Sequence, residues 1–235
     1  MAVRFEQVEV DGQPMQVFID GPDGPGPNPG IIVAVHAGGI DLFTGDVTRR
    51  LADKGYVTVT PDVFHVVPPG IEDYNEKRTY MTDTQVENDI LAGISYLQKL
   101  PNVDPNRIGI VGHCMGGRMA LQGAIVSDAF KVCVVYYGGH LNNSWGNEPK
   151  TPMERMAEVK CPVIGFFGLD DQNPSPGDVD KMEAIFKENN IEHMFHRYEG
   201  AGHGFQSFER PERYREEATQ DSSEKMWAYM LEKLG

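Results

Sequence analysis

A glycine-flanked cysteine that links a short apolar strand directly to a helix most constrains how this chain can fold. Residues 107–111 form an apolar, β-rich segment, Gly112-His113-Cys114-Met115-Gly116-Gly117 follows, and residues 119–124 have the composition of a helix start. Glycines on both sides allow a tight turn and a close approach of another group to the backbone. Cys114 is therefore predicted to stand on a sharp strand-to-helix turn above the end of a sheet.

This position gives Cys114 a candidate chemical role. The N–H groups at the start of the following helix would favour a thiolate and could stabilise a developing oxyanion. An isolated Gly-x-Cys-x-Gly match is equally compatible with a small buried cysteine. The other two cysteines, Cys133 and Cys161, lie in or beside apolar strands and are expected to be inert. Three cysteines without a C-x-x-C spacing indicate neither a disulfide framework nor a zinc site.

Length and charge limit the classes of partner. The chain has 235 residues, enough for one α/β domain over residues 1–235. With 21 Lys and Arg against 35 Asp and Glu, the net charge is −14, which argues against nucleic acid and anionic membranes as partners. The N-terminal residues alternate apolar and polar, and no apolar run approaches the roughly 18 residues of a membrane span. We expect a soluble cytoplasmic protein, monomer or homodimer, that binds a small molecule.

Strand and helix patterns alternate along the chain. This alternation predicts an α/β fold with a mostly parallel central sheet and helices on both faces. Val3–Val10 and Met15–Ile19, joined at Asp11-Gly12, predict an antiparallel N-terminal hairpin. Further strands are predicted over 31–35, 56–60, 131–137, 162–168 and 192–198, and further helices over 44–54, 84–100, 179–189 and 211–234.

Smaller features refine this prediction. Thr84-x-x-Glu87 predicts a capping box at the start of the helix over 84–100. That helix is expected to bury one apolar face, made of Ile90, Leu91, Ile94 and Leu97. Segments 63–81 and 138–158 show no clear period, and we expect them to shape a pocket.

A base and an acid for the thiol follow two later strands. Asp171 lies just beyond the strand over 162–168 and His203 just beyond the strand over 192–198, so both should reach the sheet edge that holds Cys114. A thiol nucleophile needs a base, and the base needs a third group to orient it. The order nucleophile, acid, histidine is that of the α/β-hydrolases. Asp170 remains an alternative to Asp171 on this reasoning.

Three segments together resemble the dienelactone hydrolase family, a cysteine branch of the α/β-hydrolases. They are Gly112-His113-Cys114-Met115-Gly116-Gly117, Gly168-x-x-Asp171, and Tyr198-x-x-Ala201-Gly202-His203-Gly204-Phe205. The resemblance covers nearly the whole chain. It implies an α/β-hydrolase fold, a triad of Cys114, His203 and Asp171, and hydrolysis of a lactone or ester without metal or organic cofactor. It favours Asp171 over Asp170, because the family places the acid three residues after the glycine.

The resemblance also suggests residues that would bind substrate. The backbone N–H groups of Met115 and Ala37 are the expected oxyanion donors. Arg78 is the candidate for one of two arginines with which the family holds a substrate carboxylate. The second position is Ser207 here, whereas Arg210 is off register and better explained as a solvated charge. Aromatic candidates for a pocket wall are Phe64, Tyr136, Tyr137, Trp145 and Phe205.

His36 departs from the family pattern. Characterised members that this chain resembles have a glutamate at this strand end, which interacts with the resting cysteine. A histidine cannot supply that negative charge, so His36 is expected to bond Cys114 or substrate, or alternatively the local backbone. Arg118, on the helix after the elbow, is expected to cap or pair and not to bind substrate. Dienelactone itself is therefore not expected to be the preferred substrate.

Three functions other than lactone hydrolysis stay open. A general carboxylesterase or thioesterase would use the same residues with a different pocket. A redox-sensing protein would use Cys114 as a reactive thiol without turnover, although such sensors often carry a resolving cysteine. An inactive relative is the third alternative, suggested by the departure at His36. The mechanism expected for the hydrolase proceeds through a thioester acyl-enzyme at Cys114.

Overall fold

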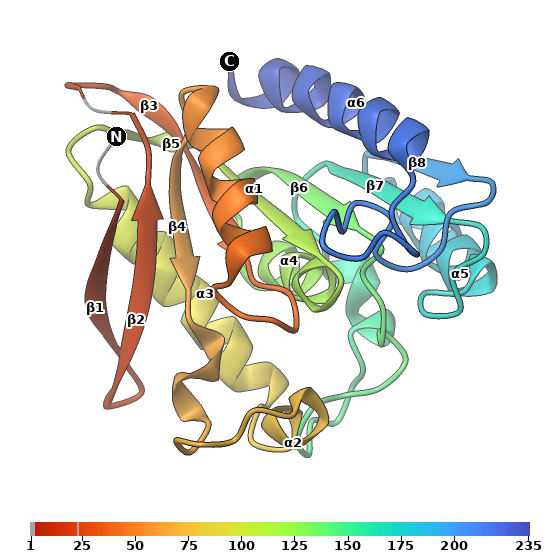
Figure 1. Ribbon diagram of the computed structural model, residues 1–235, viewed down its shortest axis with the longest axis horizontal. Helices are drawn as coiled ribbons and strands as arrows, with labels where there is room; N and C mark the ends of the chain where they lie inside the picture. Colours follow the sequence, from red (N-terminus) through yellow and green to blue (C-terminus); the bar gives the residue numbers. More distant parts are fainter. Residues whose placement is uncertain (1–2, 23) are drawn as a thin grey trace.

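The computed structural model describes residues 3–22 and 24–235, and its centre is an eight-stranded sheet (Figure 1). The strand order is β1-β2-β4-β3-β5-β6-β7-β8. From β4 onward all neighbouring strands are parallel, whereas β2 pairs antiparallel with both β1 and β4. The strands are β1 Arg4–Val10, β2 Gln13–Asp20, β3 Asn28–Ala34, β4 Val57–Pro61, β5 Val103–His113, β6 Phe130–Tyr136, β7 Val163–Gly168 and β8 His193–Tyr198.

The N-terminal hairpin forms as predicted. Asp11 and Gly12 have φ values of 52° and 77°, so both turn residues adopt the left-handed conformation that a tight hairpin of this kind requires. Val10 then pairs with Gln13 and Arg4 with Ile19. The hairpin places an antiparallel edge beside the parallel strands, which confirms the mixed sheet expected from the sequence.

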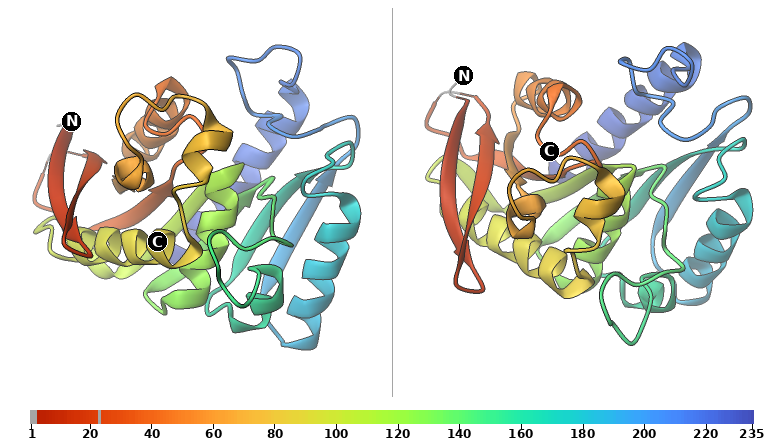
Figure 2. Two further views of the ribbon diagram at one scale, coloured as in Figure 1. Left: turned by 90° about the horizontal axis from the view of Figure 1, so that it is seen from below. Right: turned by 60° about the horizontal axis from the view of Figure 1, so that its bottom comes forward.

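Helices cover both faces of the sheet (Figure 2). α1 (Leu42–Asp53) and α6 (Glu216–Leu234) pack on one face, and α3 (Asp83–Gln98), α4 (Met115–Val126) and α5 (Pro176–Glu188) pack on the other. Each face has its own apolar core. Across residues 3–22 and 24–235, no helix combines the length and apolar character needed to cross a lipid bilayer.

The two segments without a clear period contain short helical turns. Segment 63–81 holds a 3₁₀ turn, Val63–Val66, and the short helix α2, Tyr74–Arg78. Asp62 and Asp73 cap these turns with their carboxylates. Segment 138–158 holds the 3₁₀ turn Met153–Glu158. A piece of one turn is too short to establish a hydrophobic period, which is why the sequence shows none.

The predicted start of the helix over 84–100 is wrong. Its cap is Thr82, whose hydroxyl accepts from the Gln85 N–H, while Thr84 donates to Glu148. The capping pattern Thr-x-x-Gln two residues earlier supplies the cap instead. Of the predicted apolar face, Ile90, Ile94 and Leu97 are buried, whereas Leu91 is 39% exposed because it lies one helical step to the side.

The C-terminal helix also begins later than predicted. α6 starts at Glu216, and residues 211–215 instead form a turn in which the N–H groups of Arg213 and Tyr214 both donate to the carbonyl of Arg210. Pro211 has no N–H to offer and its ring fits the first position of such a turn. This turn matters for the site, because it brings Arg210 and Arg213 toward the ends of the parallel strands.

Close backbone contacts leave no room for a side chain at the glycines on either side of Cys114. A Cβ on Gly112 would lie 1.9 Å from the carbonyl oxygen of Gly116. A Cβ on Gly116 would lie 2.1 Å from the carbonyl oxygen of Ala34, at the end of β3. Backbone atoms have little freedom to move aside, so these positions require glycine. The glycines thus allow α4 to start directly against the ends of β3 and β5.

We expect Gly116→Ala to lower the free energy of unfolding by about 1–3 kcal/mol, because its Cβ would overpack against β3. Gly177→Ala is the matched control. Gly177 is also the second residue of its helix, α5, but the nearest atom to its Cβ would be the Ser175 hydroxyl oxygen at 3.8 Å. Urea unfolding of both variants provides the measurement. Equal effects of the two substitutions would contradict the close contact at the elbow.

Candidate active site

Cys114 occupies a strained turn between β5 and α4. Its φ and ψ are 56° and −120°, in the left-handed half of backbone space that non-glycine residues seldom adopt. Its backbone N–H donates to the Tyr136 carbonyl at 3.0 Å, which ties the turn to the end of β6. Gly112 and Gly116, on either side, have no side chain that would obstruct this tight turn. This is the strand-to-helix elbow that the sequence predicts.

Side chains that follow three of the parallel strands form a chain of contacts that ends at the sulfur. The Cys114 Sγ lies 3.0 Å from Nε2 of His203, and Nδ1 of His203 lies 3.0 Å from Oδ2 of Asp171. Cys114 follows β5, Asp171 follows β7 and His203 follows β8. Parallel strands bring their carboxyl ends to one edge of the sheet, so residues distant in sequence become neighbours there.

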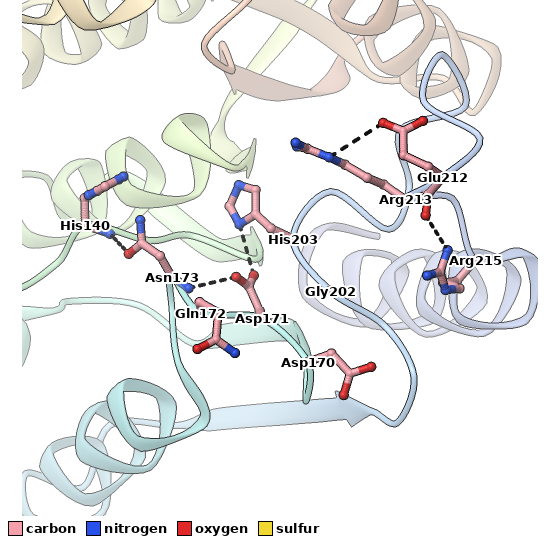
Figure 3. A pocket seen from close by; sticks show the side chains of 10 residues that line it. All are labelled: His140, Asp170, Asp171, Gln172, Asn173, Gly202, His203, Glu212, Arg213 and Arg215. Carbon is pink, nitrogen blue, oxygen red and sulfur yellow. Dashed lines mark hydrogen bonds and ion pairs between the residues drawn. The ribbon is translucent and has the colours of Figure 1, made fainter.

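The structure distinguishes between the two adjacent aspartates. Asp171 is 2% exposed, and its Oδ1 accepts from the N–H of Asn173 at 2.8 Å. Asp170 is exposed, and its side chain points away from His203 (Figure 3). Of the two aspartates, Asp171 is therefore the one that contacts the His203 ring.

Two opposing effects act on the Cys114 thiol. Burial alone would raise its pKa, but the hydrogen bond and positive charge of His203, with the N–H groups of Met115 and Ala37, outweigh burial and lower the pKa. For His203, burial lowers the pKa, while the bonds to Asp171 and Cys114 raise it to about 10. These opposite shifts favour a thiolate beside an imidazolium.

The backbone N–H groups of Met115 and Ala37 converge on the sulfur. Met115 is the first residue of α4, and Ala37 lies just beyond the end of β3. Both act on Cys114 as hydrogen-bond donors. They belong to different segments, so the close packing of α4 on β3 at Gly116 sets their spacing.

His36 bonds a carboxylate beside the site and not the thiol. Its Nε2 lies 2.8 Å from both carboxylate oxygens of Asp41, and its Nδ1 lies 3.4 Å from the N–H of Gly38. Asp41 also caps α1 through the N–H of Thr44. His36 therefore bonds a nearby carboxylate, and the backbone of Gly38 at longer range, in place of Cys114. Because His36 also lines the cleft described below, its contact with substrate stays a prediction.

His113 is next to the nucleophile in sequence but faces the core. Its ring stacks on Tyr136 with a centroid distance of 4.4 Å, and its Nε2 lies 3.0 Å from Oε1 of Gln206. Burial lowers the pKa of His113 to about 3. It is therefore neutral near pH 7. The bond to Gln206 links the residue before Cys114 to the loop that holds His203.

Arg118 is buried in an ion pair, as expected for a residue that pairs instead of binding substrate. Its Nη2 lies 2.6 Å from Oδ1 of Asp83, and its guanidinium stacks 4.3 Å from the Trp145 ring centroid. Arg118 also donates to the carbonyls of His140 and Asn143. Asp83 accepts from the N–H of Trp145. This network holds segment 138–145 beside Cys114.

Three hollows border His203, and two of them also border Cys114. The first is a cleft of about 250 Å³ that contains both residues. The second is a small cavity of about 50 Å³, lined by Tyr74, Cys114, Met115, Arg118, Gly139, His140, Trp145 and His203. The third, of about 500 Å³, lies on the far side of the His203 ring and is lined by polar residues (Figure 3). The cleft is lined by His36, Ala37, Gly38, Asp41, Phe43, Tyr74, His113, Cys114, Tyr137, His203, Gly204, Ser207, Glu209, Arg210 and Arg213.

The predicted wall residues lie in different places. Trp145 lines the small cavity and Tyr137 lines the cleft. Phe205, by contrast, is fully buried against Tyr137 and Tyr198, because the turn after His203 directs it into the core. Arg78 is the last residue of α2, and its positive charge contributes, after burial and Arg118, to the lowered pKa of His140.

Sequence reasoning missed other residues at the site. Tyr74 lines both the cleft and the small cavity, and Arg210 and Arg213 line the cleft. Arg210 is exposed, as expected for a solvated charge, yet it borders the cleft. Neither arginine stands out within the charged run 209–213, and only the turn before α6 reveals their position. Within residues 3–22 and 24–235, no three His, Cys, Asp or Glu side chains form a cluster that could hold a metal ion.

The sheet order and the elbow at the end of β5 define an α/β-hydrolase. The sequence profile of the "Dienelactone hydrolase family" matches residues 15–234. The chain belongs to this family, which comprises hydrolases of the lactone and ester type.

Individual relatives agree with this assignment. A Synechocystis sp. protein named "Putative carboxymethylenebutenolidase" is 28% identical over 235 residues, covering 95% of each chain. A protein of the same name from Methylorubrum extorquens is 31% identical over 202 residues, which is 83% of this chain and 69% of its own. The crystal structure titled "Putative Dienelactone Hydrolase" from Klebsiella pneumoniae has a TM-score of 0.87 at 25% identity and covers 98% of this chain and 99% of its own.

The pH dependence of thiol alkylation tests the electrostatics of the site. We expect Cys114 to react with iodoacetamide with a midpoint below the ordinary thiol pKa of about 8.5. In His203→Ala the midpoint should rise above that value, because burial is then opposed only by the N–H groups of Met115 and Ala37. Burial raises the pKa of Cys161 to about 12 and also raises that of Cys133, so both should stay unreactive. The same midpoint in both proteins would contradict the pairing.

Proposed function

We propose that this protein hydrolyses a lactone or carboxylic ester through a thioester on Cys114, with His203 and Asp171 completing a triad. The observation that supports it most is the continuous chain of contacts, 3.0 Å from Sγ to Nε2 and 3.0 Å from Nδ1 to Oδ2. A nucleophile, a base and an orienting acid in contact are the arrangement that covalent acyl transfer needs. Neither a metal nor an organic cofactor has a part in this chemistry.

The first half of the reaction uses the thiolate and imidazolium together. The sulfur attacks the carbonyl carbon of the substrate. The carbonyl oxygen becomes an anion, which the N–H groups of Ala37 and Met115 stabilise. When the bond between the carbonyl carbon and the leaving oxygen breaks, His203 Nε2 gives its proton to that oxygen. The alcohol of an ester leaves at this point, whereas the hydroxyl of an opened lactone stays joined to the acyl group. A neutral histidine remains beside the thioester.

The second half reverses the proton transfer. His203 takes a proton from a water molecule, which attacks the thioester carbonyl. The carbon–sulfur bond then breaks, the acid product leaves, and the thiolate and imidazolium are restored. Asp171 stabilises the positive ring at both stages and keeps its Nε2 directed at the sulfur.

The name shared by the two relatives specifies a carboxymethylenebutenolide, which is a lactone. This supports a lactone or an activated ester as substrate. This chain has His36 where the family pattern has a glutamate. His36 bonds Asp41, so His203 is the side chain that bonds the sulfur. This difference supports a substrate other than dienelactone.

The redox-sensor alternative explains less of the site. A sensor thiol needs a lowered pKa but has no use for an acid behind the histidine or for two N–H donors beside the sulfur. A carboxylesterase or thioesterase would use every group described, so it differs from the lactonase only in the preferred substrate. A panel of lactones, oxygen esters and thioesters compares these activities.

Turnover of p-nitrophenyl acetate tests the proposed function. The wild-type protein should release nitrophenol continuously, and Cys114→Ala should lose at least about a hundredfold in kcat/KM. Cys133→Ala is the matched control and should keep the wild-type rate once its folding is verified by circular dichroism. Full activity in Cys114→Ala would contradict the proposal.

The two adjacent aspartates offer a second test. We expect Asp171→Asn to lower kcat by about 10²–10⁴, because an amide no longer holds the histidine in the right tautomer or stabilises its charge. Asp170→Asn changes the neighbouring, exposed carboxylate in the same way and should leave kcat within about twofold. Steady-state kinetics of both variants decide the assignment. If kcat fell more in Asp170→Asn than in Asp171→Asn, the assignment of Asp171 as the acid would be contradicted.

A further inference from the structure

The small cavity beside Cys114 is separate from the cleft and much smaller. It has a volume of about 50 Å³, against about 250 Å³ for the cleft. Cys114 and His203 line both spaces, so both open onto the reacting sulfur. Tyr74 also lines both. A substrate bound at the sulfur could therefore place one part in each.

The walls of the two spaces differ in burial. Met115, Arg118 and Trp145, which line the small cavity, are each at most 4% exposed. Glu209, Arg210 and Arg213, which line the cleft, are exposed. The small cavity is therefore the enclosed side of the site, and the cleft is the side from which solvent and product can exchange.

The order of events in the proposed reaction assigns a part of the substrate to each space. In an ester the alcohol must depart while the acyl group is still bonded to sulfur. In a lactone the freed hydroxyl stays joined to the acyl group and must move aside. In both cases water must then reach the same carbon. Exchange of alcohol for water needs the open cleft. The acyl group stays behind, so the enclosed cavity suits it.

We propose that the small cavity is the subsite for the acyl part of the substrate, and that it selects short, uncharged acyl groups. This inference rests on the proposed function, because it assumes an acyl group on Cys114. A volume of 50 Å³ offers room for about three or four non-hydrogen atoms. In a lactone, the ring carbons next to the carbonyl would enter this cavity while the ring oxygen faces His203.

The polar groups around the cavity argue against a charged acyl chain. The guanidinium of Arg118 is already paired with Asp83 and bonded to two carbonyls, so its charge is balanced. Burial raises the pKa of Tyr74 to about 12, and burial with Arg118 lowers the pKa of His140, so both are neutral near pH 7. Among the residues that line the cavity, Arg118 is already paired, and His203 gives up its proton to the leaving oxygen. A carboxylate on the acyl group would therefore lose its hydration without a cation that stays free to replace it.

A series of p-nitrophenyl esters tests the subsite, because the leaving group stays constant while the acyl chain grows. We expect kcat/KM to fall about tenfold or more between acetate and hexanoate. The hemisuccinate ester, which has a terminal carboxylate, should be a poorer substrate than the butyrate ester, whose chain is uncharged. Rates are divided by those of hydroxide-catalysed hydrolysis to remove intrinsic reactivity.

Tyr74→Ala removes a ring from the wall of the small cavity, so it should enlarge the cavity and reduce the ratio of acetate to hexanoate activity at least about fivefold. Tyr80→Ala is the matched control, since Tyr80 follows the same short helix but is 44% exposed and lines neither space. It should keep the wild-type ratio. Because Tyr74 is only half-buried on a surface turn, both variants are expected to fold.

The outcomes separate the subsite from the proposed function. If Cys114 becomes acylated but activity is flat or rises with chain length, the acyl group lies in the cleft and the subsite is wrong. An unchanged ratio in Tyr74→Ala would overturn it in the same way. If no ester acylates Cys114, the proposed function itself fails, and the subsite fails with it.

Discussion

The contact between the Cys114 sulfur and Nε2 of His203 is the interaction on which the chemistry of the site depends. At 3.0 Å it couples two buried groups, so that each stabilises the charged form of the other against the cost of burial. Without the imidazolium, burial would keep the thiol protonated. Without the thiolate and Asp171, burial would keep the ring neutral. The reactive state therefore belongs to the pair, and the surrounding fold serves to hold the two residues together.

Several rigid contacts maintain that geometry. The glycines of the elbow let α4 start against β3, which places the N–H groups of Met115 and Ala37 around the sulfur. The Gln206 side chain joins the residue before Cys114 to the loop after His203. On the other side, Asp83 and its buried ion pair hold segment 138–145. The active groups lie at strand ends, but their spacing comes from this packing below and beside them.

The parts of the fold predicted from sequence were those governed by local patterns. Apolar runs located the strands, Asp11-Gly12 located the hairpin, and the glycines around Cys114 located the elbow. The family resemblance, beyond those patterns, pointed to Asp171 in preference to Asp170. Contacts between distant segments were not predictable in the same way. His36 bonds Asp41, Phe205 turns into the core, and Tyr74 lines the cavity beside the sulfur, because tertiary packing and not periodicity decides where those side chains point.

The proposed mechanism requires that Cys114 becomes acylated and loses the acyl group again during each turnover. Rapid-quench intact-mass analysis with p-nitrophenyl acetate tests it most directly, with the modified residue located by peptide mapping. We expect one acetyl group on Cys114. Its formation and its loss should each be at least as fast as kcat. Turnover without any label on Cys114, or a label that persists while product continues to form, would contradict it.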